Sequence, residues 1–324
     1  MAAASPHDAL FKATFGQSDI ARSELELVLP PQIRVQLDLA TLVVCPGSFV
    51  DEELQHTHSD LLYAVRTRDG GHGLVYVLFE HQSSPDRTMP FRLLRYMVRI
   101  WERWLRDHPG ASLPIVLPVL LHHGEGAWSA APDFASMLDA SPALLEASRP
   151  FQPHFRFVLD DLAPLTPEVL SSRALGALPR LVQLALWASR SFPRLRDAAP
   201  FMRAVAATLV RDERTRSLLI QLYVYLLRSA QPDVEVTAVR TILLEVAGPH
   251  GQEDVVNAAE QLIEQGEVKG LRVAITHVLG ARSMPLSEVG RARLSVCADV
   301  ATLTLWLERA ATATSEAEVF AVAP

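Results

Sequence analysis

The chain has 324 residues, of which 49% are hydrophobic and 21% charged, and its formal net charge is −7. This length leaves room for about two domains, and the apolar fraction supports a sizeable core, which excludes a largely disordered protein. The longest apolar stretch, residues 113–121, is far shorter than the roughly 20 residues of a membrane-spanning helix, so we expect no membrane association.

The cysteines and the first residues indicate a cytoplasmic protein. Cys45 and Cys297 are isolated thiols without the paired spacing of a zinc site, which is typical of a reducing compartment. The first eight residues lack a basic segment followed by an apolar one, so we expect no secretory signal. A negative net charge still allows nucleic-acid binding, provided that basic side chains gather on one surface.

The first part of the chain predicts one helix and an ambiguous segment. Apolar residues recur at helical spacing from about His7 to Leu29, and Pro30 follows as a breaker. Residues 37–44 predict either a weak strand or a short helix followed by an extended segment. Residues 49–58 are polar and acidic.

The most informative stretch is a predicted β-hairpin over residues 59–82. Its flanks are β-branched and aromatic runs of strand length, and the glycine-rich segment 69–73 between them is typical of a turn. Side chains alternate along a strand, so Glu80 and Gln82 project from one face. If the two strands pair, Asp60 meets Glu80 and Gln82 near the same end. Two carboxylates and an amide oxygen suit a hard divalent cation, which prefers oxygen ligands.

A simpler explanation of these acids is that strands often end at the surface, where acidic residues are common. Residues 74–79, however, are almost wholly apolar, which indicates a buried central strand. A carboxylate at the end of such a strand is costly to desolvate unless it has a partner or a metal ion.

Residues 90–106 predict a helix with two faces, begun by Pro90. Arginines repeat along one face, and their planar, permanently charged groups suit phosphate oxygens. A solvated arginine face on an ordinary surface helix is the alternative, and spacing alone does not decide between them. The arginines are Arg92, Arg95, Arg99, Arg103 and Arg106, and the apolar arc expected to pack on the sheet is Phe91, Leu94, Val98, Trp101 and Leu105.

Two further strands are predicted at residues 113–124 and 154–162, which completes an α/β core with mixed strand pairing. His122 and His123 lie near the end of the first of these strands. Because adjacent strand residues face opposite ways, we do not expect them to share a metal ion.

Beyond residue 166 the strand signals vanish and helical periodicity takes over. The breaker Gly248-Pro249-His250-Gly251 interrupts it. We therefore expect a core domain over residues 5–165, a helical region over 166–247 and a helical extension over 252–324. The predicted helices are 175–187, 199–211, 217–230, 236–246, 253–279 and one within 294–310.

Five short motifs in the first half occur in a fixed order, at residues 7–12, 48–54, 59–63, 80–84 and 91–96. Each motif is weak alone, but the ordered set is specific. It resembles the Rpn (recombination-promoting nuclease) family, whose members are often labelled transposases. The resemblance is close to about Leu162 and looser over the helical half.

This resemblance implies a PD-(D/E)xK fold, also called restriction-endonuclease-like: a mixed sheet flanked by helices, with the site at a hairpin. It also implies Mg²⁺-dependent DNA cleavage, linked to recombination, mobile elements or phage defence. By position, Asp60 matches the leading aspartate and Glu80 the second acid, and both would hold Mg²⁺, with Mn²⁺ or Ca²⁺ as alternatives. Gln82 occupies the place that lysine usually holds. Glutamine can orient and hydrogen-bond but carries no charge, so the source of positive charge stays open, with Arg92 and Arg95 as candidates.

Further residues are candidates for the same site. Asp51 or Glu53 could add a metal-binding carboxylate, although a solvated acidic turn is the simpler explanation of these residues. Glu24 is a candidate because this superfamily often contributes a carboxylate from its first helix. Phosphate contacts are expected from His7 and Lys12, unless the start of that helix is merely capped, and from Arg92, Arg95 and Arg99.

Two functions stay open from the sequence: a Mg²⁺-dependent DNA endonuclease, and a catalytically inactive module of the same fold that binds nucleic acid or protein. The helical half could dimerise, bind DNA or contact a partner. A homodimer would allow each active site to cut one DNA strand. Sequence preference is not readable, because phosphate contacts carry no base information.

Overall fold

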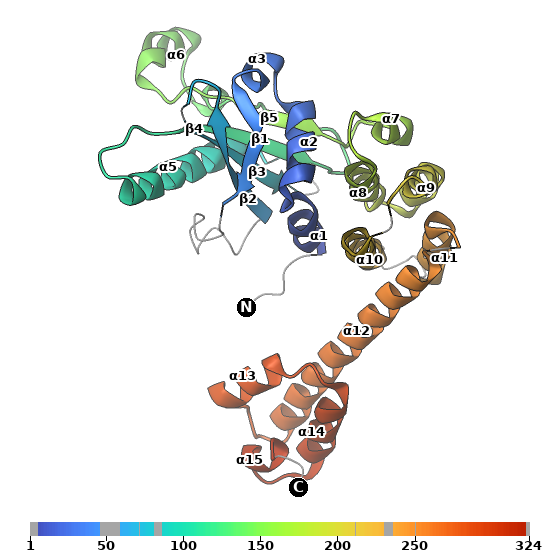
Figure 1. Cartoon of the computed structure of the whole chain (residues 1–324). Helices are drawn as coiled ribbons and strands as arrows, with labels where there is room; N and C mark the ends of the chain where they lie inside the picture. The colour runs from blue at the N-terminus through green and yellow to red at the C-terminus, as the bar shows by residue number, and fades with distance from the viewer. Residues whose placement is uncertain are drawn as a thin grey trace. The chain divides into compact units, whose positions relative to one another are not determined.

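A computed structural model describes residues 6–45, 59–70, 72–80, 86–210, 212–229, 236–249 and 251–321. Over these ranges the chain is mixed α/β, with one five-stranded sheet followed by helices. It divides into two compact units, Met1–Val255 and Val256–Pro324 (Figure 1). Among the described helices, none combines the length and apolar character that crossing a bilayer requires.

The sheet contains its strands in chain order, and its pairing is mixed, as the sequence predicted. The first three strands pair antiparallel, whereas β3–β4 and β4–β5 are parallel and need crossover connections. Residues 37–44, ambiguous in sequence, form a strand. The strands are β1 (Leu37–Val44), β2 (Ser59–Thr67), β3 (His72–Glu80), β4 (Ile115–His122) and β5 (Val158–Asp161).

Helices cover both faces of the sheet (Figure 1). On one face lie α1 (Pro6–Phe15) and α2 (Ser18–Val28), where the Tyr63 hydroxyl of β2 donates to the Phe15 carbonyl over 2.6 Å. The predicted single helix of residues 7–29 is therefore two helices. They separate at Gly16, where an added Cβ would lie only 2.3 Å from the Lys12 carbonyl oxygen. A short helix, α3 (Pro31–Arg34), precedes β1.

On the other face lies α5 (Met89–Asp107), which also forms the crossover from β3 to β4. It buries Leu93, Tyr96 and Ile100 against Leu62 of β2 and Leu120 of β4, in one apolar cluster. We refer to this side of the sheet as the α5 face.

The predicted apolar arc of this helix was wrong for three of its five residues, although Trp101 does pack against the cluster. Phe91, Val98 and Leu105 are 48%, 41% and 44% exposed, whereas Leu93 and Ile100 are buried. Successive residues of an α-helix lie about 100° apart, so the predicted arc missed the buried stripe by roughly one residue. The helix carries apolar side chains around more than half of its circumference, and the packing with the sheet selects which of them are buried.

The rest of the first unit is helical, apart from short connections. The helix α8 is apolar on nearly all sides and buried from Leu181 to Ala188, because α7, α9 and α10 surround it. The helix predicted at residues 199–211 instead begins at Phe192, since Ser191 caps it by accepting from the Arg194 N–H and Pro193 suits its first turn. The helices are α6 (Pro142–Ser148), α7 (Pro167–Ser172), α8 (Ala177–Ala188), α9 (Phe192–Ala206), α10 (Glu213–Arg228) and α11 (Val236–Ala247), with 3₁₀ turns at Ala135–Met137 and Arg149–Phe151.

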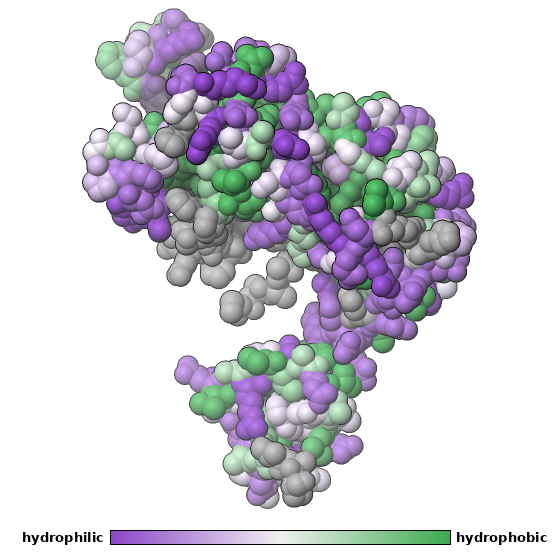
Figure 2. All heavy atoms as spheres, in the orientation of Figure 1, coloured by the Kyte–Doolittle hydropathy of each residue, from purple (hydrophilic) through white to green (hydrophobic). Residues whose placement is uncertain are grey.

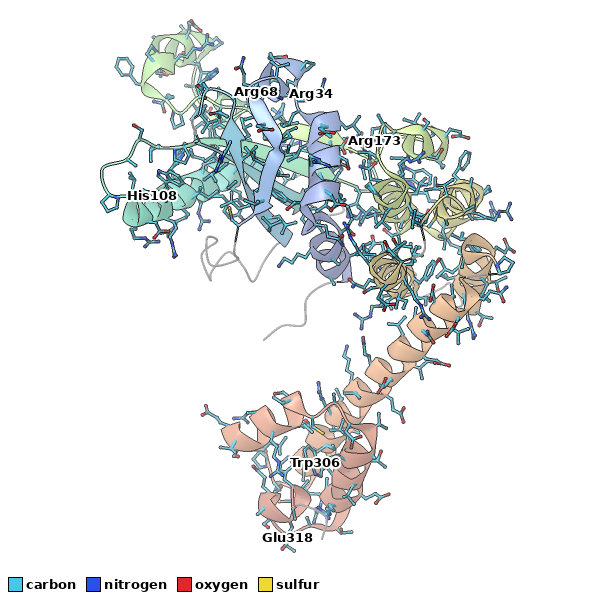
Figure 3. The ribbon with its side chains drawn as sticks, viewed as in Figure 1. Arg34, Arg68, His108, Arg173, Trp306 and Glu318 are labelled. Carbon is cyan, nitrogen blue, oxygen red and sulfur yellow. The ribbon has the colours of Figure 1, made fainter. Side chains whose placement is uncertain are left out.

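The second unit has its own apolar core, which includes Leu279, Leu303 and Trp306. Trp306 meets Phe320 edge-to-face at 4.8 Å between ring centroids (Figure 3). Apolar and hydrophilic residues are intermixed over the face of the molecule seen in Figure 2. The helices of this part of the chain are α12 (Gln252–Ala281), which begins in the first unit, α13 (Glu288–Val296), α14 (Val300–Thr312) and α15 (Glu316–Val319).

Candidate active site at the end of the sheet

The register of the hairpin brings positions 60 and 80 together. Asp60 pairs with Leu78, and Glu80 follows two residues later on β3. Paired residues of an antiparallel ladder share a face, as do residues two apart, so positions 60 and 80 are diagonal neighbours about 7–8 Å apart. Leu62 lies two residues after Asp60 on the same strand, so the two share a face, and Leu62 packs under α5. Positions 60 and 80 therefore both belong to the α5 face. Their side chains lie outside the described part of the structure.

The neighbouring strands extend this row. His122 of β4 is the parallel partner of Glu80, and Asp161 of β5 is the partner of His122. Leu120, two residues before His122, lies in the cluster beneath α5, so His122 belongs to the α5 face as well. One end of the sheet therefore collects Asp60, Glu80, His122 and Asp161 in a row across four strands. We call this the terminal row.

Buried His122 and partly buried Asp161 form a dyad. The His122 side chain is 1% exposed, and its Nδ1 lies 2.8 Å from Asp161 Oδ1. Asp161 also accepts the backbone N–H groups of Trp128 at 2.7 Å and Ala163 at 3.1 Å. Burial raises the pKa of Asp161, but the hydrogen bonds from His122 and these N–H groups outweigh burial and lower the pKa overall. Asp161 is thus a carboxylate, and Nδ1 of His122 donates to it.

The second imidazole nitrogen, Nε2, is buried. Among the residues that the structure describes, His122 Nε2 has no hydrogen-bond partner. The ring edge of Trp128 packs at 5.2 Å from the His122 ring, and Trp128 in turn packs edge-on against Phe157 at 6.1 Å. These aromatic contacts cover the His122 ring, whereas the Asp161 side chain remains 15% exposed. Such a buried, unsatisfied polar atom is unusual and calls for a ligand, a water or a strained role.

The arginines of α5 differ in their surroundings. Arg92 pairs with Asp86 at 2.8 Å, and both side chains are largely buried. Burial raises the pKa of Asp86, but hydrogen bonds from Arg92 and Thr88 outweigh burial and lower the pKa overall. Arg92 therefore acts at least partly as an internal counter-ion. Arg99 and Arg103 pair with carboxylates one turn further along their own helix, Glu102 at 3.2 Å and Asp107 at 2.8 Å.

The direction of α5 decides which arginine lies nearest to the terminal row. Trp101 and Trp104, in its second half, donate to the carbonyls of Pro114 and Ser112, just before β4 begins. The second half of α5 therefore lies beside the start of β4, and its first turns lie toward the end of β3. Exposed Arg95 belongs to those first turns, and it makes no ion pair with the described side chains.

Glu24 lies on the opposite face of the sheet from the terminal row. Its carboxylate accepts the Gln183 amide at 2.7 Å and lies beside Asp160, which pairs with Leu121 and so faces away from the row. Burial, and then the adjacent Asp160, raise the pKa of Glu24 well above its ordinary value. Glu24 and the terminal row lie on opposite faces of the sheet, and the structure does not bring the Glu24 carboxyl group to positions 60 and 80. Exposed Lys12 lies on α1, which covers the same opposite face.

The remaining expected site residues fall outside the described part of the chain. These are Gln82, Asp51 and Glu53, together with the side chain of His7. Among the side chains that are described, no three His, Cys, Asp or Glu residues form a metal-binding group; the side chains at positions 60 and 80 are not part of that set.

Two polar clusters were not predicted from the sequence. Arg173 holds Asp160 through two hydrogen bonds of 2.7 and 3.0 Å and also donates to Gln183 (Figure 3). The His122–Asp161 dyad was missed because it joins residues 39 positions apart. The only signal for either cluster was polar residues placed directly after apolar strands, at His122 and at Asp160-Asp161.

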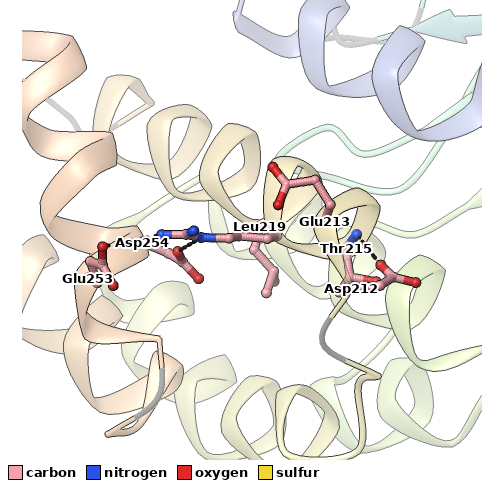
Figure 4. A pocket seen from close by; sticks show the side chains of 7 residues that line it. Asp212, Glu213, Thr215, Leu219, Glu253 and Asp254 are labelled. Carbon is pink, nitrogen blue, oxygen red and sulfur yellow. Dashed lines mark hydrogen bonds and ion pairs between the residues drawn. The ribbon is translucent and has the colours of Figure 1, made fainter.

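A solvent-facing pocket at the start of α10 holds a further acidic cluster (Figure 4). Three of its four acidic side chains have partners within the cluster. Arg216 pairs with Asp254 at 2.7 Å and with Glu253 at 3.4 Å, and Asp212 caps α10 by accepting the Thr215 N–H at 2.7 Å. These contacts account for the cluster as ion pairing and helix capping.

Comparison with known proteins gives the family. Residues 5–219 match the family model described as "Putative transposase, YhgA-like". Recombination-promoting nuclease RpnA of Escherichia coli K12 is 30% identical over 295 residues, which cover 89% of this chain and 93% of that protein. The chain belongs to the Rpn family. This confirms the resemblance drawn from the five motifs.

Two further relatives show how the similarity is distributed. Recombination-promoting nuclease RpnD of Escherichia coli O157:H7 is 44% identical over 120 residues, 37% of this chain and 46% of that protein, so the match spans less than half of that relative. Inactive recombination-promoting nuclease-like protein RpnE of Escherichia coli K12 is 32% identical over 268 residues, 82% of this chain and 84% of that protein. Among solved structures, none matches the chain.

Proposed function

We propose that this protein is a divalent-metal-dependent nuclease that hydrolyses phosphodiester bonds of DNA at the terminal row. We further propose that its mixed sheet is a restriction-endonuclease-like, PD-(D/E)xK core. The observation that carries the proposal is the register of β2 and β3, in which positions 60 and 80 are diagonal neighbours on the α5 face. The names of RpnA and RpnD, both recombination-promoting nucleases, support the same activity.

The residues of this end of the sheet suit a divalent cation. Two carboxylates, at positions 60 and 80, supply oxygen ligands, and the buried, unpartnered Nε2 of His122 lies on the same row within the described structure. When bound, such a cation neutralises phosphate charge and lowers the pKa of a coordinated water. Mg²⁺ is the proposed ion, with Mn²⁺ or Ca²⁺ as alternatives.

Other residues would orient the substrate. In this proposal Gln82 hydrogen-bonds at the reacting phosphate, and Arg95 on the first turns of α5 neutralises a backbone phosphate next to the cut. Arg92 is held by Asp86 and contributes to the positive potential rather than a direct contact. Asp51 and Glu53 are retained as proposed additional carboxylates.

The relative RpnE, which is named inactive, makes an inactive DNA- or protein-binding module the second candidate. The two candidates differ in one measurable property: only the nuclease requires a divalent cation to convert its substrate. DNA is the proposed partner in both cases, and a cytoplasmic location accompanies it. A homodimer that cuts both strands is proposed as well, and light scattering that finds only monomer on DNA would remove it.

The deciding experiment is a plasmid-nicking assay with Mg²⁺, Mn²⁺ and Ca²⁺. The wild type should nick supercoiled DNA with Mg²⁺ or Mn²⁺, and Asp60→Asn and Glu80→Gln should each lower the rate by at least about 100-fold. Asp107→Asn, at the far end of α5, is the matched carboxylate control and should retain the rate. A wild type that binds DNA but leaves it intact with every ion favours the inactive module.

A further inference from the structure

We propose that His122 is a nitrogen ligand of the cation at the terminal row, with Asp161 as the residue that orients it. The inference rests on the proposed function, since it concerns the same cation. It adds to that function a ligand of a different chemical kind, an imidazole, which makes the site a mixed nitrogen and oxygen site.

The first support is position. His122 is the direct parallel partner of Glu80, and neighbouring strands lie about 4.8 Å apart. Both positions belong to the α5 face, as does Asp60. Side chains at positions 60, 80 and 122 can therefore converge on one ion between β2, β3 and β4.

The second support is the orientation of the ring. The imidazole bonds Asp161 on β5 through Nδ1 at 2.8 Å, and β5 lies on the side of β4 away from β3. The two ring nitrogens point outward from the imidazole in widely diverging directions, so anchoring Nδ1 to β5 turns Nε2 away from β5. Position 80, on β3, lies on the other side of β4 from β5.

The third support is the hydrogen bonding of Asp161. Asp161 accepts three hydrogen bonds, from Nδ1 of His122 and from the backbone N–H groups of Trp128 and Ala163. Because Nδ1 is engaged with Asp161, Nε2 is the ring nitrogen that is left to bind a metal ion, and histidine binds metals through either of its two nitrogens. A carboxylate that fixes the far nitrogen of a ligand histidine is the usual support around protein metal ions.

The fourth support is that nothing in the described protein uses this lone pair. Nε2 is buried, and it has no hydrogen-bond partner among the described residues. The neighbouring His123, also buried, differs: its ring bonds the Leu186 carbonyl at 3.1 Å and contacts Arg190 at 3.0 Å. Among the described residues, the structure therefore gives hydrogen-bond partners to the His123 ring but none to Nε2 of His122.

An imidazole ligand changes which ions bind well. Nitrogen ligands favour transition metals such as Co²⁺ over Mg²⁺ and Ca²⁺, which prefer oxygen. We expect Co²⁺ to bind more tightly than Mg²⁺. In His122→Asn, where the amide can still donate to Asp161 but no atom replaces Nε2, Co²⁺ affinity should fall by at least about 10-fold. The loss for Mg²⁺ should be smaller, because it relies on the carboxylates. Asp161→Asn should lower Co²⁺ affinity by about 10-fold or more.

The direct test is proton NMR of the full-length protein loaded with Co²⁺ alone. A histidine bound through Nε2 to Co²⁺ gives a strongly shifted signal from its Nδ1–H, which exchanges with D₂O. We expect this signal in the wild type, its loss in His122→Asn and its retention in His123→Asn. His81→Asn is the second control, because His81 adjoins Glu80 in the sequence.

Each outcome decides the inference. Absence of the shifted signal in Co²⁺-loaded wild type, or its retention in His122→Asn, overturns the assignment; the wild-type spectrum decides even if the variant does not fold. Cleavage of DNA without the signal removes the His122 ligand and leaves the nuclease intact. The signal without cleavage in any ion keeps the ligand and removes the nuclease. Failure of Co²⁺ to bind contradicts the imidazole ligand, whereas the nuclease is then decided by the plasmid-nicking assay with Mg²⁺ and Mn²⁺.

Discussion

Gln183 of α8 donates its side-chain N–H to Glu24 of α2 over 2.7 Å and joins two helices that are 159 residues apart in the sequence. The same Gln183 accepts a hydrogen bond from Arg173, whose guanidinium also donates to Asp160 at the end of the sheet. A single buried polar network thus connects the first helices, β5 and the helices that follow the sheet. The carboxyl groups of Glu24 and Asp160 are both buried, so the network depends on the single positive charge of Arg173.

Loss of the Arg173 charge is expected to lower the free energy of unfolding. Arg173→Met leaves Asp160 without its counter-ion next to Glu24, and removing one partner of a buried pair typically costs about 3–5 kcal/mol. We expect this loss in the free energy of unfolding, measured by urea denaturation of the first unit. Arg196→Met is the matched control, because the Arg196 side chain is 71% exposed and its pair with Asp197 is 4.0 Å long; it should cost less than about 1 kcal/mol. Equal losses in both variants would contradict a stabilising network.

The raised pKa of Glu24 predicts a pH dependence of stability. A carboxyl with a raised pKa in the folded state binds its proton more tightly when folded than when unfolded. Its contribution is therefore fully present below the ordinary value of 4.5, and it is lost as the pH rises toward the folded-state pKa. Within this window each pH unit costs about 1.4 kcal/mol.

Glu24→Gln tests this dependence, because glutamine mimics the protonated acid: its oxygen can accept from Gln183 and its N–H can donate to Asp160. We expect the variant to gain stability relative to the wild type as the pH rises from 5 to 8, followed by urea denaturation at each pH. Glu26→Gln, on the exposed side of the same helix, should show no such trend. A wild-type advantage that grows with pH would show that Glu24 is ionised in the folded protein.

The direction of α5 predicts unequal roles for its arginines in DNA binding. Arg95 lies on the first turns, toward the terminal row, whereas Arg106 lies near the start of β4. Each phosphate contact contributes about 0.9 to the slope of log affinity against log salt concentration. We expect Arg95→Ala to reduce this slope by about that amount and Arg106→Ala to leave it unchanged, measured by fluorescence anisotropy with duplex DNA. Equal effects would indicate a general positive surface instead of a directed contact.

The second unit is expected to depend on Trp306. This side chain is 6% exposed, packs edge-to-face on Phe320, and lies under the Arg293 guanidinium at 5.6 Å. Removing a buried aromatic side chain typically costs about 3–5 kcal/mol. Trp306→Ala should destabilise residues 256–324 by this amount in hydrogen exchange, with little change in the first unit. Val296→Ala, at an 81% exposed side chain of the same unit, should be nearly neutral.

The sequence alone determined the elements whose pattern is local. The glycine-rich turn between two β-branched runs specified the hairpin, and the ordered motifs were enough to identify the family. The arginine spacing specified the helix of residues 90–106 within one residue at each end, because periodicity needs only neighbours in the chain. Helix starts were harder to place: the helix expected from residue 199 begins at Phe192, where a capping serine and a first-turn proline outweigh the apolar pattern.

Tertiary structure decided everything that depends on contacts between distant segments. The packing against the sheet determines which side of α5 is buried. The fold also places Glu24 on the opposite face of the sheet and brings His122 into hydrogen-bond contact with Asp161. A strand register is a relation between two segments, so one sequence position cannot reveal its partner on the next strand. For the same physical reason, the alternation along a strand shows only that residues two apart share a face of the sheet. The packing of helices on the sheet decides which of the two faces that is.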